Sequence, residues 1–140
     1  MSEILQTKFN TEYEPKIRKR FAVDVTDGNG ESLIPTYVIK ETSIPSFRYN
    51  WFGFKKYYSF RLSLYNPVVP SSTQLVFDAL KTNKVNIHIT ILGPCGDKIE
   101  EWKIKNAKIE SVVFDDYDWN NESPAMIQLD FKIKDVILLY

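Results

Sequence analysis

Hydrophobic and polar residues alternate with a period of two along several segments of the chain. The clearest alternation runs over residues 85–91, with polar residues between the apolar positions Val85, Ile87, Ile89 and Ile91. A period of two places alternate side chains on opposite faces of a strand, so one face of this segment is predicted to be buried. The sequence GPCGD at residues 93–97 follows and is typical of a tight turn. We therefore predict a β-hairpin, and residues 85–102 form the centre of the predicted fold.

Similar patterns predict further strands on both sides of this hairpin. One strand is predicted from Phe21 to Val25, before a turn at residues 27–30. A second is predicted to contain Tyr37, Val38 and Ile39 and to end near Ser43, where Pro45 interrupts the ladder. Alternation over residues 58–64 and again over residues 125–133 predicts two more strands. The last of these has Leu129 and Phe131 on its apolar face, so both are predicted core residues.

The segment that returns from the central turn has an irregular pattern. Ile99 is out of phase with Trp102 and Ile104, and a β-bulge at Glu100-Glu101 would restore one buried face. A second strand over residues 107–114 has a similar slip at Glu110-Ser111. Two neighbouring slips indicate a strongly bent hairpin. Trp102 is predicted to lie largely buried against Ile87, Ile89 and Ile91, and the apolar end of the chain, residues 136–140, is predicted to pair or pack.

A single helix is predicted over residues 71–82. Ser71 and Gln74 have the spacing of a capping box. Apolar residues recur at i and i+4 as Leu75 with Ala79 and Val76 with Leu80, which is typical of an amphipathic helix. The sequence alone thus predicts a mainly β, mostly antiparallel fold with one helix, arranged as one domain over residues 1–140.

Residues 46–58 hold an unusual density of aromatic side chains. Asn50 and Gly53 permit a reversal, and Lys55-Lys56 interrupts the apolar run. The segment is either an ordinary hairpin folded over its own core or an extended arm that contacts another subunit, and the pattern leaves both interpretations open. The aromatic residues are Phe47, Tyr49, Trp51, Phe52, Phe54, Tyr57 and Tyr58.

Charge and cysteine content exclude several classes of function. Lys plus Arg and Asp plus Glu are both 18, so no global field attracts nucleic acid or an anionic membrane. Cys95 is the sole cysteine, so no disulfide can form within the chain, which fits a reducing compartment. The first residues lack the apolar region of a signal peptide, and no segment approaches the roughly 18 apolar residues of a membrane helix.

The polar beginning of the chain, residues 1–19, is predicted to be an N-terminal arm. It contains most of a short basic cluster, whose members are Lys16, Arg18, Lys19 and Arg20. Such a cluster is usually part of a solvated and mobile terminus, and the alternative is a contact with DNA or with an acidic neighbour.

Candidate chemistry is sparse. His88 is the single histidine, which excludes Ser-His-Asp triads and sites with several histidines. Cys95 has no base near it in sequence, which argues against a nucleophile. The acidic residues 115–122 begin like a calcium loop, but Asn121 replaces the required glycine and Ile127 stands at the position of the bidentate glutamate. We predict no catalytic residues, no metal site and no cofactor.

Several segments together resemble the tail tube proteins of contractile-tailed bacteriophages. The resemblance covers residues 21–140 and lies in order and spacing. It is carried by the run LYNP at residues 64–67, the helix at residues 71–80, the turn ILGPCGD at residues 91–97 and Glu100-Glu101-Trp102. The strand beginning at Ala107, Phe114, the acidic loop with Asp118-Trp119 and the final alternating strand complete it.

The resemblance implies a fold and an assembly. The fold would be two packed antiparallel sheets, as in a β-sandwich, with one flanking helix. Six subunits would close a ring, and rings would stack into the rigid inner tube of a contractile tail, within a sheath and above a baseplate, through which DNA passes without sequence-specific binding. Related tubes belong to type VI secretion systems and contractile injection systems. The protein would then be a virion component that assembles in the host cytoplasm and contacts no membrane.

The resemblance also implies a role for the aromatic segment. Residues 46–58 resemble a long hairpin loop that reaches an adjacent ring. The expected inter-ring contacts are Phe47, Tyr49, Trp51, Phe52, Phe54, Lys55, Lys56 and Tyr57. The alternatives are a tube initiator in the baseplate, a subunit of a secretion or injection tube, and a small β-sandwich module that binds a ligand through Tyr49, Trp51 and Trp119.

Overall fold

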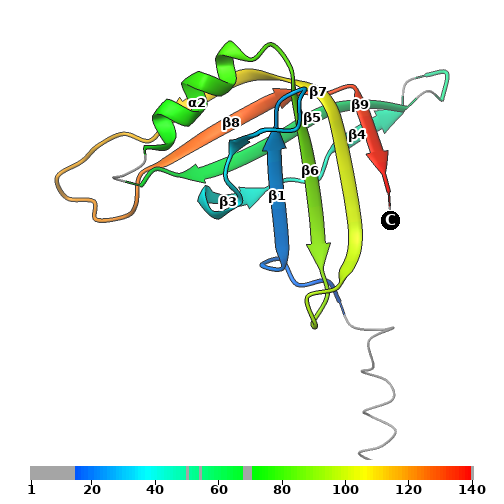
Figure 1. Ribbon diagram of the computed structural model, residues 1–140, viewed down its shortest axis with the longest axis horizontal. Coiled ribbons are helices and arrows are strands. Elements are labelled where there is room, and N and C mark those ends of the chain that lie inside the picture. Colours follow the sequence, from blue (N-terminus) through cyan, green and yellow to red (C-terminus); the bar gives the residue numbers. More distant parts are fainter. Residues whose placement is uncertain (1–14, 50, 54, 68–70, 140) are drawn as a thin grey trace, which may run out of the picture.

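The computed structural model describes residues 15–49, 51–53, 55–67 and 71–139. The fold consists of two antiparallel sheets that share one long strand (Figure 1). Sheet A contains, in spatial order, β2 (Ser32–Ile34), β1 (Phe21–Thr26), β6 (Val85–Leu92), the first half of β7 (Lys98–Phe114) and β9 (Asp135–Leu138). Sheet B contains the second half of β7, β8 (Met126–Lys132), β5 (Lys55–Tyr65) and β3 (Ile39–Thr42), and β4 (Ser46–Tyr49) pairs with the first half of β5.

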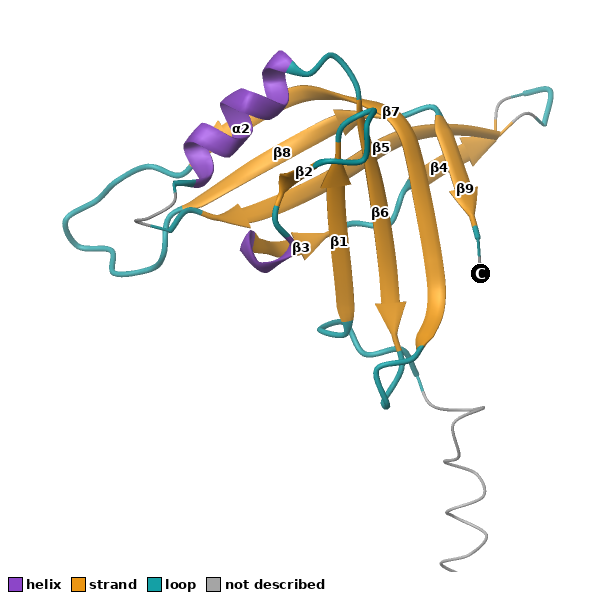
Figure 2. Cartoon of the chain, in the orientation of Figure 1, coloured by secondary structure: helices purple, strands orange, loops and turns teal. Residues whose placement is uncertain are grey.

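The strands of the two sheets run crosswise (Figure 2). The apolar side chains of both sheets form one core cluster. Ile87 and Ile89 of sheet A and Leu129 and Phe131 of sheet B are buried in one cluster. Phe60 lies opposite Phe131 in the ladder, and their ring centroids are 5.7 Å apart. The mainly β prediction with one helix is therefore confirmed, and the alternating segments supply the core.

Trp102 lies opposite Ile89 in the ladder between β6 and β7. Its side chain is half-buried and packs at the edge of the core, as does Ile91. The indole Nε1 is itself buried and meets no acceptor among the described residues. Trp102 therefore lies against the expected strand, but it covers the rim of the core instead of filling its centre.

β7 is one strand of 17 residues, where the sequence pattern predicted two. Its residues pair with β6 and β9 in sheet A and then with β8 in sheet B. The predicted slip at Glu110-Ser111 is confirmed, because the register shifts between Ile109 and Ser111. The bulge predicted at Glu100-Glu101 is wrong, since the extra residue is Ile99, between Lys98 and Glu100.

A further irregularity in β7, absent from the sequence prediction, is at Asn106. Val85 pairs with Ala107 and Ile87 with Ile104, so β7 has one more residue here than β6. Asn106 has φ of 56° and donates its N–H to Oδ1 of Asn86 at 3.1 Å. Asparagine adopts this left-handed conformation more readily than most residues. The strand can therefore bend at the junction between the two sheets.

Residues 36–38 correct the predicted second strand. Thr36–Val38 forms a short 3-10 helix, and β3 begins only at Ile39. Pro35 precedes the turn with φ of −64°, and its carbonyl accepts from Val38 N–H at 3.2 Å. This geometry buries Val38 and leaves Tyr37 70 % exposed. Local turn chemistry after the proline therefore overrides the strand propensity of Tyr37 and Val38.

Helix α2 spans Ser72–Lys81 and packs beside β2. Ser71 is the N-cap, and its hydroxyl accepts from the Thr73 N–H at 3.2 Å. Gln74 does not complete the predicted capping box, because its amide donates to Asp78 instead. Val76 and Ala79 face the core, whereas the predicted partner Leu80 is 43 % exposed. Among the described residues, no helix is long and apolar enough to cross a membrane.

Candidate assembly surfaces

The β4–β5 hairpin extends beyond the body of sheet B (Figure 1). β8 pairs with β5 from Phe60 onward, so residues 55–59 of β5 pair with β4 and not with β8. The register matches Phe47 with Tyr57 and Tyr49 with Lys55. The segment is therefore a two-stranded ribbon that projects from the fold, and we call residues 46–58 the arm.

The arm carries a group of exposed aromatic side chains. Trp51 is fully exposed, Phe52 and Tyr49 are largely exposed, and Phe47 is 42 % exposed. The Phe47 and Tyr49 rings pack edge to face at 5.9 Å on one side of β4. Asn50 and Phe54, and the side chains of Lys55 and Tyr57, lie outside what the structure describes, and Lys56 is exposed. Apolar surface of this kind is typical of contact sites.

Sheet B has strand edges without a neighbour on both sides of the described fold. β3 pairs with β5 on one side and with no described strand on the other. At the opposite side of the sheet, residues 108–114 of β7 pair with β8, while the ladder to β6 stops at Ala107. Unpaired edges are templates for another chain. The two edges are different surfaces, as head-to-tail association between copies requires.

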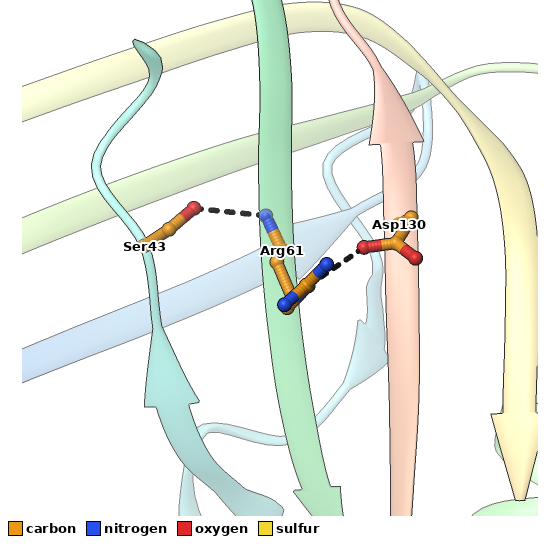
Figure 3. A network of polar contacts seen from close by, with 3 residues as sticks. All are labelled: Ser43, Arg61 and Asp130. Carbon is orange, nitrogen blue, oxygen red and sulfur yellow. Dashed lines mark hydrogen bonds and ion pairs between the residues drawn. The ribbon is translucent and has the colours of Figure 1, made fainter.

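Polar side chains in the middle of the outward face of sheet B are ordered by cross-strand contacts (Figure 3). Ser43 accepts from the Arg61 N–H through its Oγ at 2.8 Å and donates its own N–H to the Arg61 carbonyl at 2.9 Å. Arg61 Nε donates to Asp130 Oδ1 at 2.9 Å. Charged and small polar side chains thus cover the middle of this face, and the exposed Tyr65 and Val113 lie further along it.

A groove of about 830 Å³ lies beside β1 and β3, between the two sheets. Its basic side chains belong to Lys16, Arg18, Lys19, Arg20 and Lys40, and its acidic ones to Glu41 and Glu100. Lys16 Nζ is 3.1 Å from Glu100 Oε2, and Lys40 Nζ lies 5.8 Å from the centroid of Tyr65. Phe21, Tyr37 and Tyr65 add aromatic surface. We call this the basic groove.

The loop between β7 and β8 contains residues 115–122, which we call the acidic loop. It is organised by its own polar side chains. Asp118 accepts from the Asn120 N–H at 3.0 Å, and Asp115 accepts from the Met126 N–H at 2.8 Å. Tyr117 and Trp119 are almost completely exposed. The calcium-loop pattern gains no support, since the described residues contain no group of three potential metal ligands.

The remaining candidate residues lie apart from these surfaces. His88 Nε2 contacts Glu101 Oε1, and Lys98 Nζ is 3.7 Å from the same carboxylate oxygen. This arrangement occupies His88 in a cross-strand polar contact. Cys95 is exposed in the turn between β6 and β7. The basic cluster of the sequence analysis supplies one wall of the basic groove. No sequence pattern placed Lys40 and Tyr65 beside it, because they belong to segments distant in sequence.

Comparison with solved structures identifies the fold. A chain of the sheath-tube complex of PVC, an extracellular contractile injection system, aligns with a TM-score of 0.60 and 23 % identity, over 94 % of this chain and 95 % of that one. The Hcp1 protein of the E. coli EAEC 042 pathovar aligns with a TM-score of 0.65 and 12 % identity, over 86 % and 91 %. The SPP1 tail tube aligns with a TM-score of 0.64 and 12 % identity, over 89 % and 78 %.

These similarities hold over most of the chain at low sequence identity. No family model matches the sequence, and neither does the sequence of any curated protein. The predicted resemblance to tube proteins is therefore confirmed at the level of the fold, which this chain shares with tube subunits of contractile injection systems and a phage tail.

Proposed function

We propose that this protein is a structural subunit that assembles into hexameric rings, and that the rings stack into the rigid inner tube of a contractile tail. The observation that carries the proposal is the pair of open edges on sheet B, formed by β3 on one side and residues 108–114 of β7 on the other. Joining one edge to the other in the next copy repeats the same contact, and a repeated head-to-tail contact closes into a ring when the rotation permits.

The number of subunits in the ring is part of the proposal. One structure with this fold comes from the baseplate of the anti-feeding prophage, described as six-fold symmetrised, and aligns over 89 % of this chain with a TM-score of 0.62. Six copies of sheet B would form a continuous barrel, and edge pairing would remove the exposed backbone groups that otherwise favour aggregation. The polar face with Arg61 and Asp130 would then line one side of that barrel.

The arm is proposed to connect one ring to the next. Ring closure through sheet edges uses backbone hydrogen bonds and does not require the aromatic side chains of the arm. Trp51 and Phe52 at the tip are exposed and are of the types that anchor interfaces. With Phe47, Tyr49 and the lysines of the arm, they are suited to a contact along the tube axis. A tail sheath and a baseplate would be the further partners.

A phage tail tube differs from the tubes of injection and secretion systems in that DNA passes through it. Balanced total charge argues against tight adhesion of DNA, because tight binding needs several phosphate contacts and depends steeply on salt. We therefore propose loose passage of DNA through the lumen of a virion tail that is assembled in the host cytoplasm. The second candidate is a tube or tube initiator of an injection or secretion system, which the similarity to the PVC and Hcp1 chains favours.

The ring proposal is tested at β3. The Ser43 N–H donates toward β5, and backbone amides alternate in direction along a strand, so the Thr42 N–H faces the open edge. Thr42→Pro removes this donor while the ladder to β5 keeps its own. In negative-stain electron microscopy, we expect the unmodified protein to form rings or tubes and the proline variant to remain single folded subunits.

Thr42→Val is the matched control, because it loses the hydroxyl but keeps the N–H. It should assemble like the unmodified protein. Circular dichroism must show that the proline variant is folded. Rings from the folded proline variant would exclude this edge as the closing contact. If the unmodified protein stayed monomeric at high concentration even with tube already present as a seed, the tube function itself would be excluded.

A further inference from the structure

We propose that the acidic loop of one copy docks into the basic groove of a second copy of this chain. This inference deepens the proposed assembly, because it names a contact between subunits in addition to the sheet edges and the arm. The acidic loop and the basic groove carry opposite charge, although the total charge of the chain is zero. Both surfaces combine charge with aromatic side chains. The groove borders the open edge of β3 through Lys40 and Glu41, and the loop follows the other open edge after Phe114, so the docking would add side-chain contacts beside the paired edges.

The groove has the chemistry of a receptor for an acidic, aromatic segment. Five basic and two acidic side chains line it, so positive charge predominates. Lys16 is already paired with Glu100, which leaves Arg18 and Lys19 as exposed cations at the same end. Its volume lies within the roughly 300–1,000 Å³ of clefts that hold sizeable ligands. Phe21, Tyr37 and Tyr65 provide surfaces against which aromatic rings can pack.

The acidic loop has the complementary chemistry. Residues 115–122 contain four acidic side chains and no basic one. Trp119 is fully exposed and Tyr117 nearly so, which shows that the groove of the same copy does not hold them. Hydrogen bonds at Asp115 and Asp118 already order the loop backbone. A preordered loop loses less conformational entropy on binding than a loose one.

Other occupants fit the groove less well. The arm has exposed aromatic residues, but it also contains Arg48, Lys55 and Lys56 and no acidic residue, so the positive groove disfavours it. A nucleic acid would meet Glu41, Glu100 and apolar surface in addition to the cations. The loop of a second copy satisfies both the charge and the aromatic character of the groove.

The test traps the contact between two distinguishable copies. Both carry Cys95→Ser, so the native thiol is absent. One copy carries Asn120→Cys beside Trp119, and the other, with a different tag, carries Glu41→Cys at the groove. A short bismaleimide should join the two copies. A pair in which Lys81→Cys, at the end of α2, replaces Glu41→Cys should give only background cross-linking.

Charge reversal then separates a specific contact from random collision. Asp116→Lys with Glu122→Lys on the loop copy leaves the backbone-binding Asp115 and Asp118 in place. We expect cross-linking to fall at least about tenfold, since like charges across an interface are strongly unfavourable. Arg18→Glu with Lys19→Glu on the groove copy should restore it. Circular dichroism of each variant checks that it is folded.

Three cross-linking results, and one result from DNA binding, would overturn the proposal. The first is a yield of cross-linked product no greater than that of the Lys81→Cys pair. The second is a yield that charge reversal does not change. The third is a yield that is lost with Trp51→Ser but retained with Trp119→Ser. The last would assign the groove to the arm. Tight, salt-sensitive binding of a DNA duplex that abolishes cross-linking would assign it to nucleic acid. The tube proposal is judged separately by the rings, so loop docking without rings would retain this inference and exclude that function.

Discussion

Arg61 and Asp130 face each other across β5 and β8, and Nε of Arg61 donates to Oδ1 of Asp130 at 2.9 Å. The Arg61 side chain is 60 % exposed and the Asp130 side chain 32 %. Water and salt therefore weaken their attraction, and the contact adds little to the stability of one subunit. Its position on the outward face of sheet B connects it to assembly, because this face would line the proposed barrel.

Replacing Arg61 should consequently have a small effect on folding. We expect Arg61→Met to lower the free energy of unfolding by less than about 1 kcal/mol, as is typical of exposed ion pairs. Urea denaturation of Arg61→Met, Asp130→Asn and the double variant gives the coupling energy of the pair. A coupling energy well above this value would show that the pair is held in a far less solvated environment than the exposed fractions indicate.

Asn106 supports the bend of β7 by adopting a positive φ. Asn106→Ala should lower the free energy of unfolding by about 1 kcal/mol, because alanine lacks the short polar side chain that lets asparagine adopt the left-handed region more readily. Asn106→Gly is the matched control, since glycine adopts this conformation freely, and it should be less destabilising than the alanine variant. Equal destabilisation by both changes, measured by urea denaturation, would attribute the effect to side-chain contacts and not to the backbone.

The sequence predicted best those strands whose two faces have different environments. β1, β6 and β8 each have one buried and one polar face, so their alternation is clean and their existence is confirmed. β7 was harder to predict, because it crosses from one sheet to the other and its register shifts twice in sheet A and once in sheet B. The pattern revealed that a bulge was needed near Trp102. It could not show that Ile99 is the extra residue, since that depends on pairing with β6.

The beginning of helix α2 is fixed by Asn66 at the end of β5. Its Oδ1 accepts from the Ser72 N–H at 3.0 Å and from the Ser71 hydroxyl at 3.2 Å. Asn66→Ala should cost about 1–3 kcal/mol, because partly buried donors lose their acceptor. Ser71→Ala removes the cap and the hydroxyl bond to Asn66 but keeps the Ser72 N–H bond, and it should cost about 1 kcal/mol. Thermal unfolding followed by circular dichroism compares the two, and a larger loss for Ser71→Ala would contradict the assigned role of Asn66.

The candidate surfaces were only partly predictable, because some of them combine residues from segments that are distant in sequence. The arm is contiguous in sequence, so its aromatic density was visible directly. The basic groove combines the Lys16 to Arg20 cluster with Tyr37, Lys40 and Tyr65, which the folding of β3 and β5 beside β1 brings together. One part of that surface was visible as a basic cluster, and it resembled an ordinary solvated terminus. Charge patterning within one segment cannot reveal a groove whose walls come from three segments.

Trp102 tests how much the rim of the core contributes to stability. Trp102→Ala should lower the free energy of unfolding by about 3 kcal/mol, the lower end for large aromatic residues, because the side chain is only half-buried. Trp102→Phe keeps most of the ring contacts and removes Nε1, whose burial without an acceptor is unfavourable. We expect it to cost less than about 1 kcal/mol. If thermal unfolding showed that Trp102→Phe loses as much stability as Trp102→Ala, Nε1 would have an important partner.

The arm should be separable from both folding and ring closure. Replacing residues 50–56 with a short Gly-Ser turn removes Trp51 and Phe52 but leaves β3, β8 and the paired part of β5 that contacts them. The aromatic residues at the tip are exposed in the subunit, so their loss should change its melting temperature little. We expect folded protein that still forms single rings in electron micrographs but no longer forms long tubes.

A milder pair of variants identifies which property of the arm matters. Trp51→Ser with Phe52→Ser keeps the length of the hairpin and removes its apolar tip, and it should shorten tubes as the replacement of residues 50–56 does. Phe77→Ser on the outer side of α2 removes a half-exposed aromatic residue elsewhere and should leave tube length unchanged. Tubes of normal length from the arm variants would exclude the arm as the stacking contact, and loss of folding would place it in the core. Because ring closure through sheet B uses backbone hydrogen bonds, a variant that lost rings together with tubes would mean that the arm also takes part in lateral contacts.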